Sequence, residues 1–181
     1  MIPKTDFVYA YIIFLLVAVA YRLKTAFVKV EGKKRRQLFR PFLKLLVGGY
    51  FAVIIGAFIE FIFIKTEISL VILFIGVVLF ISSIILRHKA IRALCDEWSL
   101  GIEISTQQRL VTDGIYKSIS HPYHFSVILE LAGFCLISNA YNSLILLILV
   151  QIPLIIVRIL LEEKVLKRKF GEHYSNYLIR L

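Results

Sequence analysis

The chain has 181 residues, of which 59% are hydrophobic and 19% are charged. This composition excludes an ordinary soluble domain, in which the apolar fraction is nearer one half. The formal net charge at pH 7 is +10, so the chain is also strongly basic. The apolar residues form long blocks without the period-two alternation of a membrane barrel, and the sequence therefore predicts a helical integral membrane protein.

Five apolar segments are predicted to span the membrane, since about 20 apolar residues cross a bilayer as a helix. They cover residues 7–21, 42–64, 68–86, 123–137 and 141–161. The fourth is short, and only Ser138, Asn139 and Ala140 separate it from the fifth. We therefore expect an all-α, multi-pass membrane protein whose last two spans form a tight helical hairpin. No soluble domain is expected, so residues 1–181 form a single membrane domain with three N-terminal spans in residues 1–86.

Basic residues gather between Arg22 and Lys44, where nine Lys or Arg accompany a single acid, Glu31. A basic run can bind nucleic acid, but between two spans it is more typical of a cytoplasmic loop that faces anionic lipid headgroups. We therefore expect contact with membrane lipids and none with nucleic acid. With this loop in the cytoplasm, residues 87–121 and the C-terminal tail are also cytoplasmic, and the turn at residues 65–67 is external.

Two acids lie inside predicted spans, where an ionised group is costly and is first suspected of function. Glu60 lies near the outer end of its span, within reach of the interface or Lys65, which favours a structural role. Glu130 lies in mid-helix. In a symmetrical hairpin it faces Gln151, which can share its hydrogen bond. The same symmetry places Arg158 at the level of His121, so two polar segments are expected to meet at the cytoplasmic membrane surface.

The segment after the fifth span combines charge with an apolar face. Arg158 and Glu162 are four residues apart and share a helix face. Apolar and basic positions then alternate with helical spacing up to Phe170. This pattern predicts an amphipathic C-terminal helix that lies on the cytoplasmic face of the membrane. Cys95 and Cys135 form no C-x-x-C pair, so neither a disulfide nor a metal site is predicted.

Three polar segments in the C-terminal half have a distinctive order and spacing. They read L-C-D-E-W-S at 94–99, R-L-V-T-D-G-I-Y-K-S-I-S-H-P at 109–122 and R-I-L-L-E-E-K-V-L-K-R-K-F-G-E-H-Y-S-N-Y at 158–177. Together they resemble the isoprenylcysteine carboxyl methyltransferase and phospholipid methyltransferase family. The resemblance implies a methyltransferase-like catalytic half at residues 87–181. It also implies S-adenosylmethionine as methyl donor and a lipid-like or prenylated acceptor, such as an isoprenylcysteine carboxylate.

The resemblance also implies residue roles. It assigns Arg158 to the substrate and assigns the donor to Leu110, Val111, Tyr116, His121, Pro122 and Glu162. His121 is suited to the carboxylate of the donor, and Glu162 to its cationic side. Gly114 permits a bend in the donor loop, and Pro122 fits the first turn of the fourth span, where a missing N–H costs nothing.

The chain departs from the family pattern R-H-P-x-Y-x-G at three positions, where it has Ser120, His124 and Ser126. For His124, packing or hydrogen bonding is weighed against direct catalysis. A carboxylate acceptor needs no base, whereas an amine acceptor needs one, for which His124 and Glu130 are candidates. The candidate catalytic residues are thus Arg158, Glu162 and His124, and the candidate substrate-binding residues are Arg158 and Glu130.

Two other functions stay open. Membrane reductases of the steroid-reductase type, which use NADPH, also have an H-P motif at the start of an apolar helix, although this chain has no Gly-rich nucleotide fingerprint. A non-enzymatic lipid-binding scaffold is the other alternative, because of the three departures from the family pattern. The sequence does not predict an oligomeric state.

Overall fold

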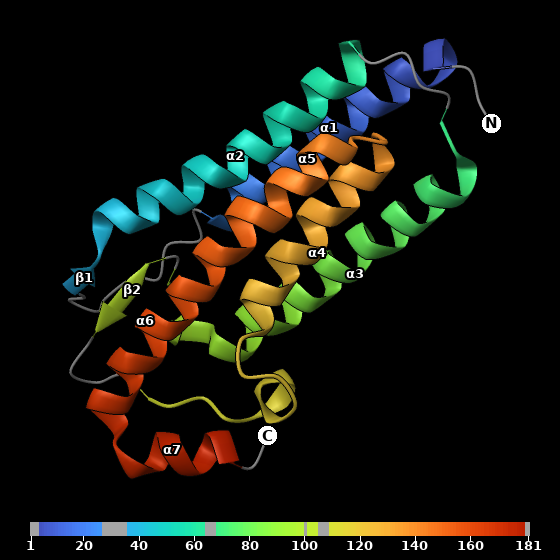
Figure 1. Cartoon of the computed structure of the whole chain (residues 1–181). Helices are drawn as coiled ribbons and strands as arrows, with labels where there is room; N and C mark the ends of the chain where they lie inside the picture. Colours follow the sequence, from blue (N-terminus) through green and yellow to red (C-terminus); the bar gives the residue numbers. More distant parts are fainter. Residues whose placement is uncertain (1–3, 27–35, 64–67, 100, 105–108, 180–181) are drawn as a thin grey trace.

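The computed structural model describes residues 4–26, 36–63, 68–99, 101–104 and 109–179. The N-terminal half contains three long helices, α1 (Lys4–Ala26), α2 (Arg40–Phe63) and α3 (Leu70–Leu94). The C-terminal half contains α4 (Pro122–Ile137), α5 (Tyr141–Leu146) and α6 (Ile152–Phe170), the last two joined by the π-helical segment η3 (Leu147–Gln151). Figure 1 shows α4, α5 and α6 between α3 on one side and α1 with α2 on the other.

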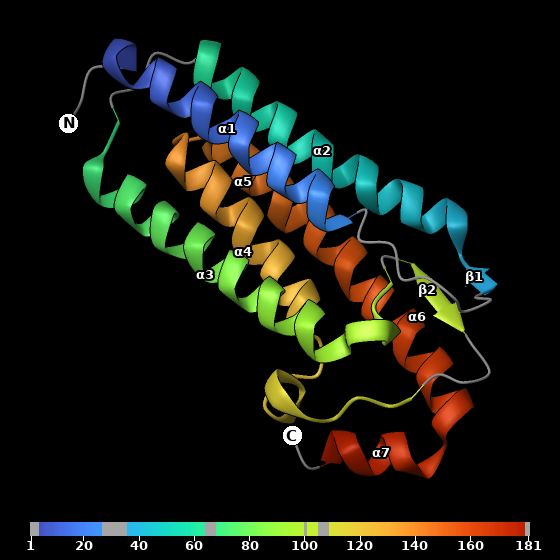
Figure 2. The ribbon, with the colours of Figure 1, turned by 180° about the vertical axis from the view of Figure 1, so that it is seen from behind.

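Smaller elements gather at one end of this bundle (Figure 2). They are the short helices η1 (Cys95–Glu97), η2 (Gly114–Lys117) and α7 (Glu172–Ile179), and the strands β1 (Arg36–Leu38) and β2 (Ile102–Ile104). The strands pair antiparallel with Gln37 opposite Glu103. The predicted all-helical fold is thus confirmed, with one short two-stranded sheet in addition, which joins the two loops that the sequence predicts to be cytoplasmic.

Within the described residues, four helical stretches are long and apolar enough to cross a membrane. They cover Phe7–Thr25, Arg40–Phe63, Leu70–Leu94 and Tyr141–Phe170. The fourth predicted span corresponds to α4, which is apolar but has only 16 residues. Large apolar side chains such as Val17, Phe74 and Leu149 are exposed on the outside of the bundle. Such surfaces are costly in water and favourable in lipid, so the chain is an integral membrane protein.

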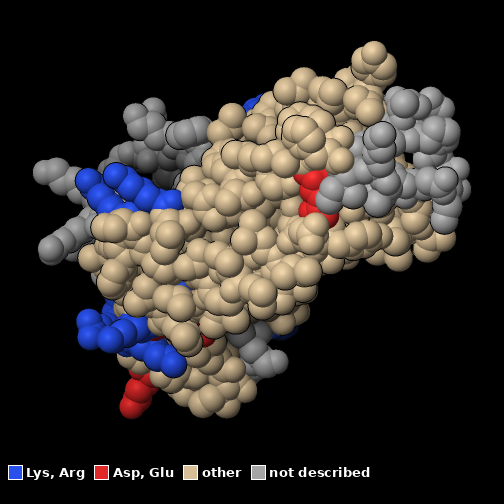
Figure 3. Space-filling model, turned by 45° about the horizontal axis from the view of Figure 1, so that its top comes forward, with Lys and Arg blue, Asp and Glu red and all other residues tan. Residues whose placement is uncertain are grey.

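Charge is unevenly distributed over this surface. In Figure 3 most of the visible Lys and Arg side chains lie at the left, the side where β1, β2 and the end of α6 lie in Figure 1, and most of the remaining face is uncharged. This distribution agrees with a basic end that faces anionic headgroups. Part of the predicted basic loop, residues 27–35, and the turn at residues 65–67 lie outside the described residues.

The hairpin between α4 and α5 is as tight as predicted. Asn139 turns the chain with φ of 52°, and the amide of Ala140 donates to Cys135 O at 2.8 Å. Glu60 of α2 binds the first turn of α5, accepting hydrogen bonds of 3.0–3.1 Å from Asn142 and Ser143. A carboxylate here satisfies amides at the helix N-terminus that have no partner within the helix. The structural role predicted for Glu60 is confirmed, although its partner is a helix start.

The end of α6 differs from the expectation. Residues Tyr141–Phe170 form one apolar helical stretch, and the amphipathic segment after Leu161 continues α6 instead of forming a separate helix. No Gly or Pro interrupts the chain between Pro153 and Gly171, where φ of 57° ends the helix. The distinct C-terminal helix is α7, which begins at Glu172.

Helices α3 and α4 are in close backbone contact. A Cβ atom added at Gly133 would lie 2.9 Å from Gly76 O and 2.9 Å from the amide nitrogen of Phe80. A Cβ atom added at Gly76 would lie 2.8 Å from the amide nitrogen of Ile137. These neighbours are backbone atoms that cannot rotate away, so the two glycines set the distance between the helices.

This contact predicts the effect of a single methyl group. Gly133→Ala should destabilise the protein by about 1–3 kcal/mol, because the methyl overpacks a backbone contact. Gly48→Ala is the matched control, since a Cβ atom there meets no atom within 4 Å. Thermal unfolding in detergent measures both variants. Equal stability of the two variants would show that α3 and α4 are not held at this distance.

Candidate active site

Gly114 and Pro122 shape the backbone of the polar loop before α4, as the sequence predicts. Gly114 has φ of 63°, a conformation that disfavours side chains, and it begins η2. Pro122 is the first residue of α4, as predicted. Between them, Tyr116 is buried, and its carbonyl accepts a hydrogen bond of 2.5 Å from the hydroxyl of Tyr177. Thus α7 folds back beneath the loop that carries η2 (Figures 1 and 2).

A cavity that we call the polar cavity lies between this loop, η1, β2 and α6. Its lining includes predicted donor-binding residues Leu110, Val111, Tyr116, His121 and Glu162, together with Arg158 and His124. Gly114 and Pro122 do not line it, so their contribution is to the backbone of its wall. Burial, reinforced by the negative charge of Glu162, raises the pKa of the Tyr116 phenol, which therefore stays neutral at physiological pH.

Arg158 and His124 form the central contact of this cavity. Both side chains are buried, and Arg158 Nε donates to His124 Nε2 at 2.7 Å. Because a guanidinium has only donors, Nε2 must accept, which makes His124 a neutral imidazole with its proton on Nδ1. The sequence placed Arg158 at the level of His121. The structure confirms that Arg158 meets this part of the chain, and the residue in contact is His124, in the first turn of α4.

Glu162 places a carboxylate oxygen near this pair without bonding to it. Its Oε2 lies 3.6 Å from His124 Nε2, but both atoms are acceptors and form no hydrogen bond. The same oxygen is buried and has no hydrogen-bond partner among the described residues. A buried carboxylate oxygen of this kind is costly unless a cation or a donor approaches it, so Glu162 is suited to a positively charged ligand.

His121 is held by a residue to which the sequence assigned no role. Its Nε2 lies 3.3 Å from Glu163 Oε1. Ligand atoms of His121, His124 and Glu162 all lie within 4.8 Å of one another, a set that can coordinate a metal ion. The lone pair of His124 Nε2, however, already accepts the N–H of Arg158, so this nitrogen is not available as a metal ligand. The arrangement is better suited to an organic ligand.

A second cavity, which we call the apolar cavity, also borders Arg158. It has a volume of about 160 Å³, and its walls are mainly the apolar side chains of Leu23, Leu43, Leu46, Val47, Phe51, Val127 and Ile155. Three residues line both cavities, namely Tyr123, His124 and Arg158. Arg158 therefore lies at the boundary between a polar compartment and an apolar one.

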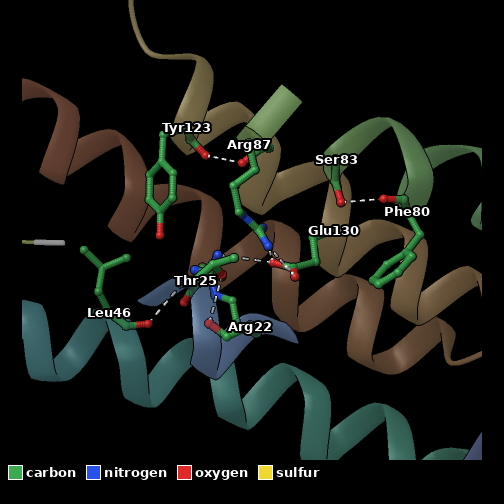
Figure 4. A network of polar contacts seen from close by, with 10 residues as sticks. Arg22, Thr25, Leu46, Phe80, Ser83, Arg87, Tyr123 and Glu130 are labelled. Atoms are coloured by element: carbon green, nitrogen blue, oxygen red, sulfur yellow. Dashed lines mark hydrogen bonds and ion pairs between the residues drawn. The ribbon is translucent and has the colours of Figure 1, made fainter. Parts of the chain in front are cut away.

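Glu130 has different partners from those expected. Figure 4 shows its carboxylate facing Arg87, which donates from both terminal nitrogens at 2.9 and 2.5 Å. Arg22 Nη1 lies 3.6 Å from the same carboxylate. The prediction that Gln151 shares the hydrogen bond of Glu130 is wrong, since Gln151 Nε2 donates to Leu46 O. The face of α4 that carries Glu130 packs on α3, because Gly76 and Gly133 bring those two helices together.

Glu130 lines neither cavity and is fully buried in its ion pair, so its geometry is that of a structural residue. Sequence reasoning missed Arg87 because the apolar run was ended at residue 86, whereas α3 continues to Leu94. It also missed Trp98, whose ring lies 4.4 Å from that of Tyr123 and which lines the polar cavity. Its place in the motif L-C-D-E-W-S was the available signal.

The buried ion pair predicts an order of stabilities. Glu130→Gln leaves two guanidinium groups without their carboxylate and should cost about 3–5 kcal/mol of unfolding free energy. Arg22→Gln leaves the pair of Arg87 and Glu130 neutral and should cost only about 1 kcal/mol, the size of a cation–π contact. Denaturant titration in detergent measures both. A Glu130→Gln variant as stable as Arg22→Gln would contradict the structural role of Glu130.

Comparison with known proteins adds one finding to this geometry. The model of the isoprenylcysteine carboxyl methyltransferase family matches residues 72–168, slightly more than half of the chain. No curated protein matches the chain. The match begins in α3 and ends in α6, so it includes the ion pair of Arg87 with Glu130 and the contact of Arg158 with His124, and it does not favour a reductase or a scaffold. The chain therefore belongs to the isoprenylcysteine carboxyl methyltransferase family, a family of membrane methyltransferases.

Proposed function

We propose that this protein transfers a methyl group from S-adenosylmethionine to a carboxylate of a lipid-like or prenylated acceptor, at the cytoplasmic side of the membrane. The observation that carries the proposal is the meeting of a polar and an apolar cavity at Arg158. A methyl donor is charged and soluble in water, whereas a prenylated acceptor is soluble in lipid. Two compartments with one shared wall would bring both reactants together, and this proximity supplies several kcal/mol of the barrier.

The polar cavity fits the donor by the chemistry of its lining. The buried, unpaired oxygen of Glu162 suits the cationic side of S-adenosylmethionine, and His121 can donate to its carboxylate. Leu110 and Val111 offer apolar cover to the flat adenine. When bound, the donor supplies a carbon already activated by its sulfonium, so the protein needs to align the reactants and exclude water.

The arrangement of bases favours a carboxylate acceptor over an amine. In carboxylate methylation an oxygen forms the new bond to the methyl carbon, the carbon–sulfur bond breaks, and sulfur keeps the electron pair, so no proton moves. An amine must lose a proton to a base. Of the two candidate bases, His124 already accepts from Arg158, and Glu130 is bound by Arg87. The role proposed for Arg158 is to hold the acceptor carboxylate, with its guanidinium oriented by His124.

Donor binding tests the polar cavity. His121→Ala and Glu162→Gln should each weaken S-adenosylmethionine binding by roughly 1–3 kcal/mol, because each variant loses a hydrogen bond to a charged group. His88→Ala and Glu172→Gln, both on exposed sites, are the matched controls and should bind normally. Calorimetry in detergent measures all four variants. Undiminished affinity in both site variants, or binding of NADPH in place of S-adenosylmethionine, would contradict the proposal.

The role of Arg158 is tested by a change that keeps its charge. Arg158→Lys loses the planar fork that binds a carboxylate through two parallel hydrogen bonds. Donor binding should survive, whereas transfer of a labelled methyl group to a membrane lipid extract should fall by more than tenfold, in line with a loss of 1.5–3 kcal/mol. An active Arg158→Lys enzyme would refute the substrate role. A variant that binds neither ligand would instead show that Arg158 holds the site together.

A further inference from the structure

Arg22 lies at the apolar cavity but outside the region that matches the family. It comes from α1, and its guanidinium carbon lies 4.7 Å from the ring centre of Tyr50 and 5.6 Å from that of Tyr123. Both rings attract the guanidinium through cation–π interactions, which favours its position between α2 and α4. Its side chain is 14% exposed, so Arg22 is nearly buried at a surface that is otherwise apolar.

Arg22 carries a positive charge in addition to that of Arg87, which already neutralises Glu130. The Glu130 carboxylate is already bound through both oxygens by Arg87. Arg22 Nη1 is 3.6 Å from that carboxylate, beyond hydrogen-bond length. Among the described residues, this cluster of Arg22, Arg87 and Glu130 therefore holds two guanidinium groups and one carboxylate. A surplus cation in apolar surroundings is costly unless an anion accompanies it.

A second polar group faces the same space. Tyr50 lines the apolar cavity, and its buried hydroxyl lies near the Glu130 carboxylate without forming a hydrogen bond of normal geometry to any described residue. Arg158 lines the cavity from α6, so two guanidinium groups from different helices border one apolar compartment. Apolar walls with a few converging polar groups are the usual form of a ligand site.

We propose that Arg22, with the hydroxyl of Tyr50, forms a second anion-binding subsite in the apolar cavity. It binds an acidic group of the acceptor other than the carboxylate that Arg158 presents for methylation, while the apolar walls cover the chain between them. The inference rests on the proposed function, and it adds a substrate class to it. The preferred acceptors are amphiphiles with two acidic groups next to the apolar tail.

Direct binding of two matched probes tests this subsite. Dodecylthiosuccinate has two carboxylates, and its monomethyl ester has nearly the same shape with one. Calorimetry on the full chain in detergent, without donor, should give roughly tenfold tighter binding of the diacid, the effect of one additional charged hydrogen bond. Arg22→Gln should remove this difference by weakening the diacid alone. Lys24→Gln, an exposed site on the same helix, is the charge-matched control and should keep it.

Two outcomes would overturn the subsite, namely equal binding of both probes by the unaltered protein and a difference that survives in Arg22→Gln. Arg22→Lys keeps the charge and should retain part of the preference for the diacid. Failure of both Arg22 variants to fold would show that Arg22 holds α1 in place, and it would also overturn the subsite. The result is separable from the proposed function. Absent donor binding would refute the methyltransferase but leave the diacid preference readable. Normal donor binding and methyl transfer without that preference would refute the subsite alone.

Discussion

The rest of the bundle depends on the ion pair between Arg87 and Glu130. Two charges taken out of water are tolerated only when their geometry is nearly ideal, and here each terminal nitrogen of Arg87 donates to a different carboxylate oxygen of Glu130. That geometry requires α3 and α4 to lie close together. Buried residues are spaced four, three and four apart on α3, at 76, 80, 83 and 87, and on α4, at 126, 130, 133 and 137. Glycines near the far end of this seam make the contact close enough for the ion pair to form.

Several features could be predicted because they depend on local sequence. Apolar length located the long helices, Ser138–Ala140 marked the hairpin, and Gly114 and Pro122 marked the bend and the start of α4. The proximity of Arg158 to the histidine loop required only that the hairpin fold back on itself. These inferences needed no knowledge of which other helix packs against which face.

The partners of Glu130 and Glu60 could not be predicted, because they depend on which helices pack together. Helix neighbours are chosen by packing across the bundle, and a symmetrical hairpin was a poor guide to them. The π-helical segment η3 takes one extra residue per turn, so it alters which face Gln151 presents. The sequence placed Arg87 just after the third span, because hydropathy falls at residue 87. The helix nevertheless continues through this charged residue, because its partner Glu130 lies on the neighbouring helix.

The departures from the family pattern also have physical explanations. Ser126 replaces a glycine on the crowded face of α4, and its hydroxyl is satisfied within the helix by donating to Tyr123 O at 2.7 Å. His124 replaces a tyrosine and offers Arg158 an acceptor nitrogen, where a phenol would compete as a donor. Ser120 lines the polar cavity at the position where the family pattern has an arginine. One cation fewer therefore lies near Arg158 and His121. The first two changes thus preserve the packing and the orientation of the central guanidinium.

The two cavities draw on different parts of the chain. Among the described residues, those that line the polar cavity begin at Leu94, so the proposed donor site belongs to the C-terminal half. The apolar cavity also takes Arg22, Leu43, Leu46 and Tyr50 from α1 and α2, which lie outside the family match. A change in these two helices would alter the chemistry of the acceptor wall without touching the residues proposed to hold the donor. Under the proposed function, acceptor choice is therefore the property that α1 and α2 control, and Arg22 is the residue through which α1 would exert it.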